Sequence, residues 1–409
     1  MSYKRLMLGG VGRMGGLRVF TRAAALVKIA ILARILTPHD FGLFGIAALA
    51  LGFFETLTET GVNQAVIHSD KKTGELMDSA WVVAIIRGFL ISILILAASW
   101  PVAEFFRDPE VLPLIWLIAV IPLVKGFINP MVVEFLKELK FGKELKFRSI
   151  LVLVDVAAAI AAGLIFKSAL SLVLALLAAG AAEVLMSFWW FKIRPRFKLQ
   201  PGYLREILGY GKWVTLSGVL SWAAGEIDDL ATGRWFGIGT LGVYQQAYKI
   251  STLPVTEVSG TVNQVAFPVL AKVKGDKNRF WKIFWGGIGG IGVIGGIGGV
   301  ILWIFPTQVV TILLGKQWLE AVPLIRYLAV FGVIRSLESG LQPAFLATGR
   351  PQVGSWGNAI KVLALLAGLA IWGRSGVSGV ALAAVVSGAA VIPYYLINLA
   401  RLGKLGKLG

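Results

Sequence analysis

The chain has 409 residues, of which 57% are hydrophobic and only 15% are charged, and its mean hydropathy is +0.78. Soluble domains carry about 25% charged residues, so this composition excludes an ordinary soluble protein and indicates a membrane protein. The sequence contains no cysteine and two histidines, His39 and His68. It therefore excludes a disulfide framework, a cysteine nucleophile and a histidine-rich metal site.

The formal net charge is +18, from 40 Lys and Arg against 22 Asp and Glu. In a soluble protein this balance would suggest a nucleic-acid partner. Here the basic residues lie mainly between hydrophobic segments, where they orient a chain in the bilayer, so we expect no nucleic-acid partner. Residues 1–16 are basic but have no short apolar core, and the first hydrophobic helix is expected to direct insertion.

Twelve segments are long enough to cross a membrane, which takes about 20 mostly apolar residues. In chain order, the first half contains 17–36, 41–67, 80–100, 111–132, 150–166 and 169–191, and the second contains 208–231, 241–270, 285–305, 322–345, 356–372 and 377–399. The first two segments of each half, and 322–345, are the more polar ones. A basic stretch at 192–205 separates the halves. The sequence therefore predicts an all-α polytopic membrane protein of twelve helices, in two six-helix lobes at 1–198 and 199–409.

Part of the first half is repeated in the second at an offset of 200 residues. Residues 34–64 match 234–264: Arg34 aligns with Arg234, Gly42 with Gly242, and both stretches end in Val-Asn-Gln. Further along the offset becomes 210, where the Pro-Leu-Ile of 113–115 meets that of 323–325. The repeat aligns the polar segments of the two halves with one another, which supports counting them as spans. It also predicts that the lobes are related by a pseudo-two-fold axis along the membrane normal.

The distribution of basic residues between the spans predicts the topology. With both termini cytoplasmic, the inner segments contain 24 Lys and Arg and the outer segments contain five. This asymmetry follows the positive-inside rule. Since each half has an even number of spans, the two lobes are expected to have the same orientation, and parallel repeats of this kind occur in transporters.

Eleven basic residues fall within the predicted spans, where a charge at mid-bilayer costs about 2.5–3.5 kcal/mol on insertion scales. Three of them, Arg18, Arg22 and Lys28, occupy an arc of about 120° on one helix face. Such a face should line a watery cavity and bind a membrane-embedded anion, most plausibly a phosphate or pyrophosphate group. The alternative is that these cations pair with acidic residues on neighbouring helices. The acidic residues considered for that role are Glu55, Glu59, Asp155, Glu183, Glu226 and Asp228.

The repeat predicts different electrostatic roles for the two lobes. Lys28 aligns with Asp228, and Glu226 and Asp229 lie beside Asp228, so the second copy of this helix is acidic where the first is basic. We expect these three acids to couple transport to H⁺ or Na⁺, or to form a switchable salt bridge, with Lys28 and Asp228 approaching each other. The alternative is that Asp228 caps or pairs locally with Arg234.

Other polar residues complete the predicted site. Arg34 and Arg234 end their helices in both copies, so we expect them to be structural caps of helix carbonyls. Polar residues on the second helix of each half are expected to line the same cavity as the cationic face. With Arg18, Arg22 and Lys28, the predicted substrate-binding set contains Lys249, Glu55, Glu59, Asn63 and Gln264.

Two stretches carry a family resemblance: residues 228–237 (DDLATGRWFG) followed by Leu241-Gly242-Val243-Tyr244, and residues 33–38 (ARILTP) followed by Asp40-Phe41-Gly42. They resemble signatures of the polysaccharide-transporter branch of the MOP exporter superfamily, the Wzx-type flippases of lipid-linked oligosaccharides. The resemblance implies a MATE-like V of two lobes that open alternately to either side. It also implies a polyprenyl-pyrophosphate-linked oligosaccharide as the substrate, moved across a bacterial or archaeal cytoplasmic membrane.

The leading interpretation is therefore a flippase that is not an enzyme and needs no cofactor. The first alternative is an ion-coupled drug or metabolite antiporter of the same superfamily, which would need an acidic cavity for cationic drugs. The second is a membrane glycosyltransferase, polymerase or ligase, which would need a sizeable outer loop, whereas the longest one predicted is 306–321. Expected partners are membrane lipids, H⁺ or Na⁺, and the polysaccharide polymerase machinery, and the protein is expected to be a monomer.

Overall fold

The computed structural model describes residues 3–59, 74–137, 141–199, 201–273 and 275–404. Within these ranges only the backbone is described at 3–15, 17–19, 74–76, 136–137, 141, 201–214, 254–268 and 404. The described residues form helices and connecting turns and contain no strand. They divide into two compact units, Met1–Val219 and Leu220–Gly409, which meet within one long helix. The predicted lobe boundary between 198 and 199 stays a prediction.

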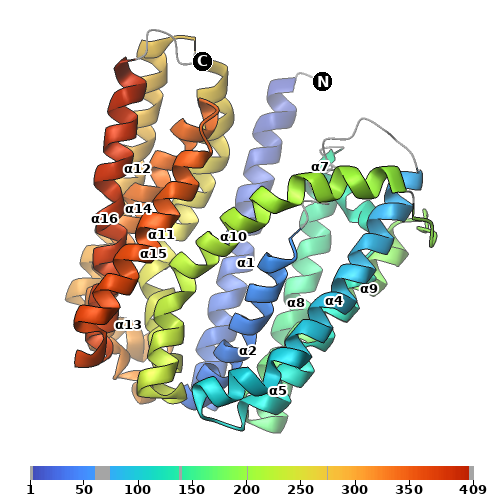
Figure 1. Ribbon diagram of the computed structural model, residues 1–409, viewed down its shortest axis with the longest axis horizontal. Helices are drawn as coiled ribbons and strands as arrows, with labels where there is room; N and C mark the ends of the chain where they lie inside the picture. Colours follow the sequence, from blue (N-terminus) through green and yellow to red (C-terminus); the bar gives the residue numbers. More distant parts are fainter. Residues whose placement is uncertain (1–2, 60–73, 138–140, 200, 274, 405–409) are drawn as a thin grey trace. The chain divides into compact units, whose positions relative to one another are not determined.

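The N-terminal unit is built of long and short helices (Figure 1). Its elements are α1 (Tyr3–Ile35), α2 (Pro38–Leu57), α4 (Gly74–Phe106), α5 (Val111–Ile118), α6 (Val120–Gly126), the 3-10 turn η1 (Pro130–Val133), α7 (Glu134–Lys137), α8 (Phe141–Phe166), α9 (Leu170–Trp190) and the first part of α10 (Pro201–Phe236). Helix α8 packs against α1 and α9, and α4 packs against α5 and α6. These contacts bring α1 beside α8, more than 100 residues away in the sequence.

The turn between α1 and α2 is fixed by a capping box. The Thr37 hydroxyl accepts from the Asp40 amide at 3.2 Å, and Asp40 Oδ2 accepts from the Thr37 amide at 2.8 Å. These bonds satisfy donors that the first turn of a helix leaves without partners. Asp40 Oδ1 also accepts from the Ala169 amide at 3.0 Å, which ties this turn to the start of α9.

The sequence predicts one span over 111–132, and the structure instead contains two short helices followed by a 3-10 turn. Pro122 explains the break because it has no N–H to donate to the carbonyl of Ile118, four residues earlier. The backbone there approaches α4 closely: a Cβ at Gly88 would clash with the Pro122 carbonyl oxygen. The kinked segment therefore packs tightly against α4.

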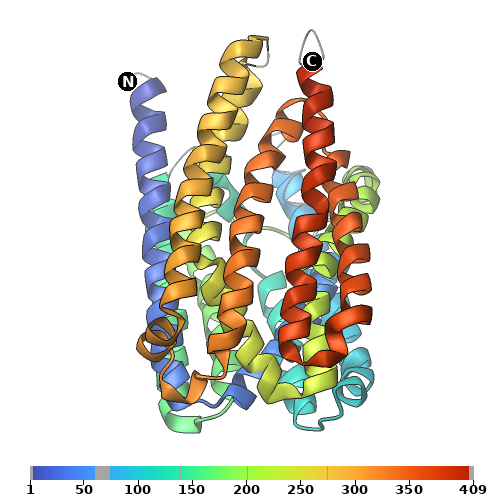
Figure 2. The ribbon, with the colours of Figure 1, turned by 90° about the vertical axis from the view of Figure 1, so that its left-hand side faces the viewer.

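The C-terminal unit contains the rest of α10 and the long helices that follow it, which run side by side in Figure 2. Its elements are α11 (Ile238–Val273), α12 (Lys277–Ile304), α13 (Pro306–Leu313), η2 (Lys316–Trp318), α14 (Ala321–Ala347), α15 (Gln352–Trp372), η3 (Gly373–Ser375) and α16 (Val377–Lys404). Helix α14 packs against α11, α12 and α16, and α15 packs against α16. A cluster that includes Phe280, Phe345 and Tyr395 forms part of the core.

The surface of the described helices is apolar over long stretches. Seven helices are long and apolar enough to cross a membrane: Pro38–Leu57, Met77–Phe106, Gly142–Phe166, Leu170–Trp190, Lys277–Ile304, Gln352–Ser375 and Val377–Gly403, counted over the described residues. Large side chains such as Ile93, Leu185 and Leu363 are exposed on them. Lipid, not water, is the solvent that suits such a surface. The chain is therefore an all-α, multi-pass membrane protein, and the count of twelve spans remains a prediction.

Candidate functional site

Of the three cations predicted to form one face of α1, the structure describes the side chains of Arg22 and Lys28. Lys28 Nζ donates to Asp155 Oδ2 on α8 at 2.6 Å, and both side chains are about one-fifth exposed. The Arg22 side chain is exposed, and the Arg18 side chain lies outside the described residues. Lys28 thus has a carboxylate partner on a neighbouring helix, which was the alternative considered from the sequence. Both ends of this ion pair are partly exposed, and the role of Lys28 in binding an anion stays a prediction.

Arg87 on α4 contacts the end of α2. Its guanidinium donates to the carbonyl oxygens of Glu55 at 2.7 Å and Thr58 at 2.9 Å, and to the Thr58 hydroxyl at 3.3 Å. The last carbonyls of a helix lack intrahelical donors and carry partial negative charge, so Arg87 satisfies them from another helix. Arg87 lies within the predicted span 80–100, but nothing in the sequence marks the end of α2 at Leu57, which it contacts.

The predicted lining residues of the second helix in each half are placed only in part. Glu55 and Glu59 are half-buried, and the Glu59 carbonyl accepts from the Thr215 hydroxyl at 3.0 Å. Lys249 on α11 is exposed. Asn63 and the side chain of Gln264 lie outside the described residues. A cavity shared by these residues stays a prediction.

The acidic residues predicted on α10 are held by side chains of α11. Asp228 Oδ2 accepts from the Tyr244 hydroxyl at 2.7 Å, and Asp229 Oδ2 accepts from Gln245 Nε2 at 2.7 Å. Both aspartates are buried, with Asp228 3% exposed. Each pair is separated by 16 residues, and buried polar groups at this depth require such partners. The partner observed for the Asp228 carboxylate is Tyr244, not the Arg234 considered from the sequence.

Arg335 on α14 extends this group. Its guanidinium donates to the Tyr248 hydroxyl and lies 5.8 Å from the ring centre of Tyr248 and 5.9 Å from that of Phe331. Glu226 interacts electrostatically with Asp228, Arg335 and Lys249. We define the C-terminal polar network as Glu226, Asp228, Asp229, Tyr244, Gln245, Tyr248, Lys249 and Arg335. The sequence indicated its acids through the repeat, but not Tyr248 or Arg335, whose positions depend on how α11 and α14 pack.

The C-terminal unit contains an ion pair between α14 and α15. Lys361 Nζ on α15 donates to Glu338 Oε1 on α14 at 2.7 Å, and the Glu338 side chain is only 5% exposed. Neither residue was a predicted site residue. Such a pair is stable only if its two charges stay together, because an unpaired charge inside the bilayer is costly.

The two arginines predicted to be structural caps are both described. Arg34 Nη1 donates to the Ala30 carbonyl of its own helix at 2.5 Å, which is the contact of a C-terminal cap. Arg234 occupies the corresponding last turn of α10. In the first copy the capping box of Thr37 follows, whereas in the second copy Gly237, with φ of 91°, makes the turn. The structural role of the two arginines stays a prediction.

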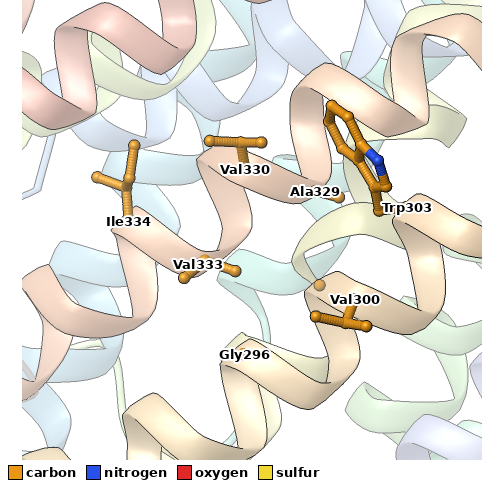
Figure 3. A pocket seen from close by; sticks show the side chains of 8 residues that line it. Gly296, Val300, Trp303, Ala329, Val330, Val333 and Ile334 are labelled. Carbon is orange, nitrogen blue, oxygen red and sulfur yellow. The ribbon is translucent and has the colours of Figure 1, made fainter.

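An apolar pocket of about 350 Å³ lies between α12 and α14 (Figure 3). Gly296, Gly299 and Val300 line it from α12, and Ala329 and Val333 line it from α14. A Cβ at Gly296 would meet no atom within 4 Å, so this glycine leaves space open, whereas a Cβ at Gly299 would clash with the Val333 side chain. None of the predicted site residues lines it, so the pocket is separate from the C-terminal polar network.

The chain matches a known protein family over most of its length. A family model described as polysaccharide biosynthesis protein matches residues 31–323. The chain belongs to this family. The matched stretch includes α2, α11 and the aspartates of the C-terminal polar network. The family thus agrees with the resemblance noted in the sequence.

Individual members of known name are distant relatives over most of the chain. The lipopolysaccharide biosynthesis protein WzxC of Escherichia coli K12 is 22% identical over 93% of this chain and 78% of its own length. The teichuronic acid biosynthesis protein TuaB of Bacillus subtilis 168 is 24% identical over 83% of this chain and 71% of its own length. Both are similar to this family member along the helices of both units.

Solved structures show the same fold. The lipid II flippase MurJ in an inward closed conformation has a TM-score of 0.76 at 14% identity, covering 95% of this chain and 87% of its own. An inward-facing MATE multidrug resistance transporter of the MOP superfamily has a TM-score of 0.68 at 16% identity, covering 94% of both chains. At such low identity these likenesses establish the fold and leave the substrate to other evidence.

Proposed function

We propose that this protein is a flippase that moves a polyprenyl-pyrophosphate-linked oligosaccharide across the cytoplasmic membrane by alternating access. The observation that carries the proposal is the family match over 31–323 in a chain whose surface suits lipid. The relatives support the same proposal, since WzxC and TuaB are named for the biosynthesis of lipopolysaccharide and of teichuronic acid. A polymer built on the inner leaflet needs a transporter before it reaches the surface.

The cations of α1 bind the pyrophosphate in this proposal. Arg22 is exposed and Lys28 is one-fifth exposed beside Asp155, so both are available to an incoming anion. Arginine suits phosphate because its planar guanidinium offers paired donors. Lys28 exchanges Asp155 for the substrate, and Arg18 and Lys249 contribute further positive charge. Glu55, Glu59, Asn63 and Gln264 contact the glycan.

The acidic residues of the C-terminal polar network supply the energy coupling. Asp228 and Asp229 are buried, and each has a single neutral side-chain donor from α11. A carboxylate held in this way is destabilised by burial unless a cation or proton neutralises it. We therefore assign Asp228, with Glu226 and Asp229, as the groups that bind H⁺ or Na⁺ or switch partners during the cycle. The protein acts as a monomer with both termini in the cytoplasm, beside the polymerase that uses its product.

An ion-coupled antiporter of small molecules is the second candidate, favoured by the TM-score of 0.68 to a MATE transporter. A cationic drug would need an acidic binding surface. The exposed cation on α1 disfavours that substrate class, whereas it suits an anionic lipid.

The decisive experiment measures flipping in liposomes with a fluorescent polyprenyl-pyrophosphate sugar. The variant Arg18→Ala/Arg22→Ala/Lys28→Ala should lose at least about 90% of the flipping rate, because removing charge-assisted contacts to a phosphate costs about 1.5–3 kcal/mol each. The matched control is Lys316→Ala/Arg374→Ala, which removes two exposed cations elsewhere. Wild-type flipping by the triple variant would overturn the proposal, and so would transport of a cationic drug in place of the lipid.

The same liposomes test the coupling role of Asp228. Asp228→Asn keeps an acceptor for the Tyr244 hydroxyl but cannot bind a proton or carry charge. We expect its flipping to lose dependence on an imposed H⁺ or Na⁺ gradient while the folded fraction stays unchanged. A variant that responds to both gradients like the wild type would remove Asp228 from the coupling mechanism and leave the flippase proposal intact.

A further inference from the structure

Residues 191–199, which we term the basic strap, combine positive charge with exposed apolar side chains. Lys192, Arg194, Arg196 and Lys198 are all exposed. Between them, Ile193 is 58% exposed and Phe197 is 72% exposed. In the part of the chain that the structure describes, none of the four cations forms an ion pair. The strap therefore presents charge and apolar surface together, and among the described residues no carboxylate is ion-paired with its four cationic side chains.

The strap is not helical, yet its backbone is held at several points. Asn129 Nδ2 donates to the Ile193 carbonyl at 2.9 Å, and the Arg196 amide donates to Asp78 Oδ1 at 2.7 Å. The Ser79 hydroxyl donates to the Lys198 carbonyl at 3.4 Å. Asn129 and Ser79 are fully buried. These bonds come from the start of α4 and the turn after α6, so a fixed part of the unit holds the strap in one conformation.

Aromatic contacts hold the same segment from inside. The ring of Phe197 lies 4.7 Å from that of buried Trp81, and the ring of Phe191 lies 4.8 Å from that of buried Phe135. Phe197 is nevertheless mostly exposed, because only one side of it faces Trp81. The strap thus directs its cations and the free side of Phe197 away from the unit.

The position of the strap in the chain puts it at a membrane surface. It begins directly after α9, whose residues Leu170–Trp190 form a candidate span. Helix α9 ends in Trp189 and Trp190, and Trp189 is 81% exposed. Exposed tryptophans at the end of a span are typical of the lipid headgroup level. The charge asymmetry of the connecting segments predicts that this is the cytoplasmic surface, which carries the negative potential of anionic lipids.

We propose that the basic strap is a binding surface for anionic phospholipid headgroups of the cytoplasmic leaflet. Lys192, Arg194, Arg196 and Lys198 contact the headgroup phosphates, and Ile193 and Phe197 enter the boundary between headgroups and acyl chains. The combination of several cations with apolar side chains is the one that peripheral membrane segments use. A soluble anion would engage the cations but would leave Ile193 and Phe197 exposed to water.

A fluorescent label on the strap tests this directly. Because the chain has no cysteine, Ile193→Cys gives the full-length protein a single thiol for an NBD fluorophore, and Leu319→Cys gives a matched label elsewhere. Each protein is placed in nanodiscs of phosphatidylcholine alone or with one quarter phosphatidylglycerol. We expect the emission of the label at 193 to shift to the blue when phosphatidylglycerol is present, and that of the label at 319 to stay unchanged.

A second measurement counts the phosphatidylglycerol molecules retained by unlabelled protein in native mass spectrometry. Each cation near an anionic surface contributes about 1 kcal/mol, or a factor of about five in binding. Arg194→Gln/Arg196→Gln, which removes two cations, should therefore weaken retention about 25-fold, and Lys316→Gln/Arg374→Gln should not. Equal retention by both double variants would overturn the proposal, as would identical emission in the two lipids. Loss of the blue shift in excess inorganic phosphate would instead identify a site for free anions and would also overturn it.

Discussion

Among the residues that the structure describes, each unit has one lysine–carboxylate pair between two of its helices, and the two pairs differ in access to their surroundings. Lys28 and Asp155 join α1 to α8 at 2.6 Å, and Lys361 and Glu338 join α14 to α15 at 2.7 Å. The two lysines are similarly exposed, at 19% and 17%. The carboxylates are not, since Asp155 is 21% exposed and Glu338 is 5% exposed.

This difference separates a pair that can exchange partners from one that holds helices together. A buried charge that loses its partner pays most of its desolvation cost, which keeps Glu338 with Lys361. Asp155 can recover solvation when Lys28 leaves, so the N-terminal pair can open for an anion at smaller cost. The proposed pyrophosphate site uses the Lys28–Asp155 pair, whose separation costs less desolvation free energy than that of Lys361 and Glu338.

The largest expected effect is on the buried pair. Lys361→Met leaves Glu338 without its cation inside the membrane, and we expect the free energy of unfolding in mixed micelles to fall by about 3–5 kcal/mol. Lys361→Met/Glu338→Leu removes both charges and should recover most of that loss. If the single and double variants were equally stable, Glu338 would not depend on Lys361, and the contrast between the two pairs would be lost.

The two repeats also differ in where their second helix ends. Helix α2 ends at Leu57, and Arg87 satisfies its last carbonyls, whereas α11 continues to Val273. Residue 287, which lies 200 positions after Arg87, is a glycine, so the arginine that contacts the end of α2 has no counterpart at that offset.

The sequence predicted the helices well because hydrophobic length is a local property. The segments at 80–100 and 150–166 lie within α4 and α8, and the segment at 169–191 exceeds α9 by one residue at each end. It did not predict the interruption within 111–132, where one proline within an apolar run breaks the helix and hydropathy does not register the lost hydrogen bond. Hydropathy averages over many residues, whereas this break in the helix depends on the missing backbone N–H of one residue, Pro122.

The site was predictable only as far as single helices allow. The repeat indicated Lys28 and Asp228 because the two copies differ there, and this can be seen in the sequence without knowing how the helices pack. Asp155 was one of six candidate partners, and nothing in the sequence ranked it above Glu55 or Glu183. Choosing it required the contact between α1 and α8, which joins residues 127 positions apart. Tyr248 and Arg335 were missed for the same reason.

The smallest expected effect on stability is at the exposed pair. Lys28→Met leaves Asp155 with partial access to solvent, so we expect a loss of only about 1–2 kcal/mol, between the values typical of surface and buried pairs. Flipping should nevertheless fall strongly, because the variant cannot offer a cation to the substrate. Lys28→Arg, which keeps the charge, should retain most of the flipping rate.

Comparing stability with flipping in the same variants decides what the N-terminal pair does. If Lys28 is only structural, Lys28→Met/Asp155→Leu should restore flipping together with stability, because both charges are gone and the helices can pack. If Lys28 binds the substrate, the double variant should recover stability and remain inactive. The second outcome separates Lys28 from Lys361, whose matching double variant should regain stability and keep its flipping activity.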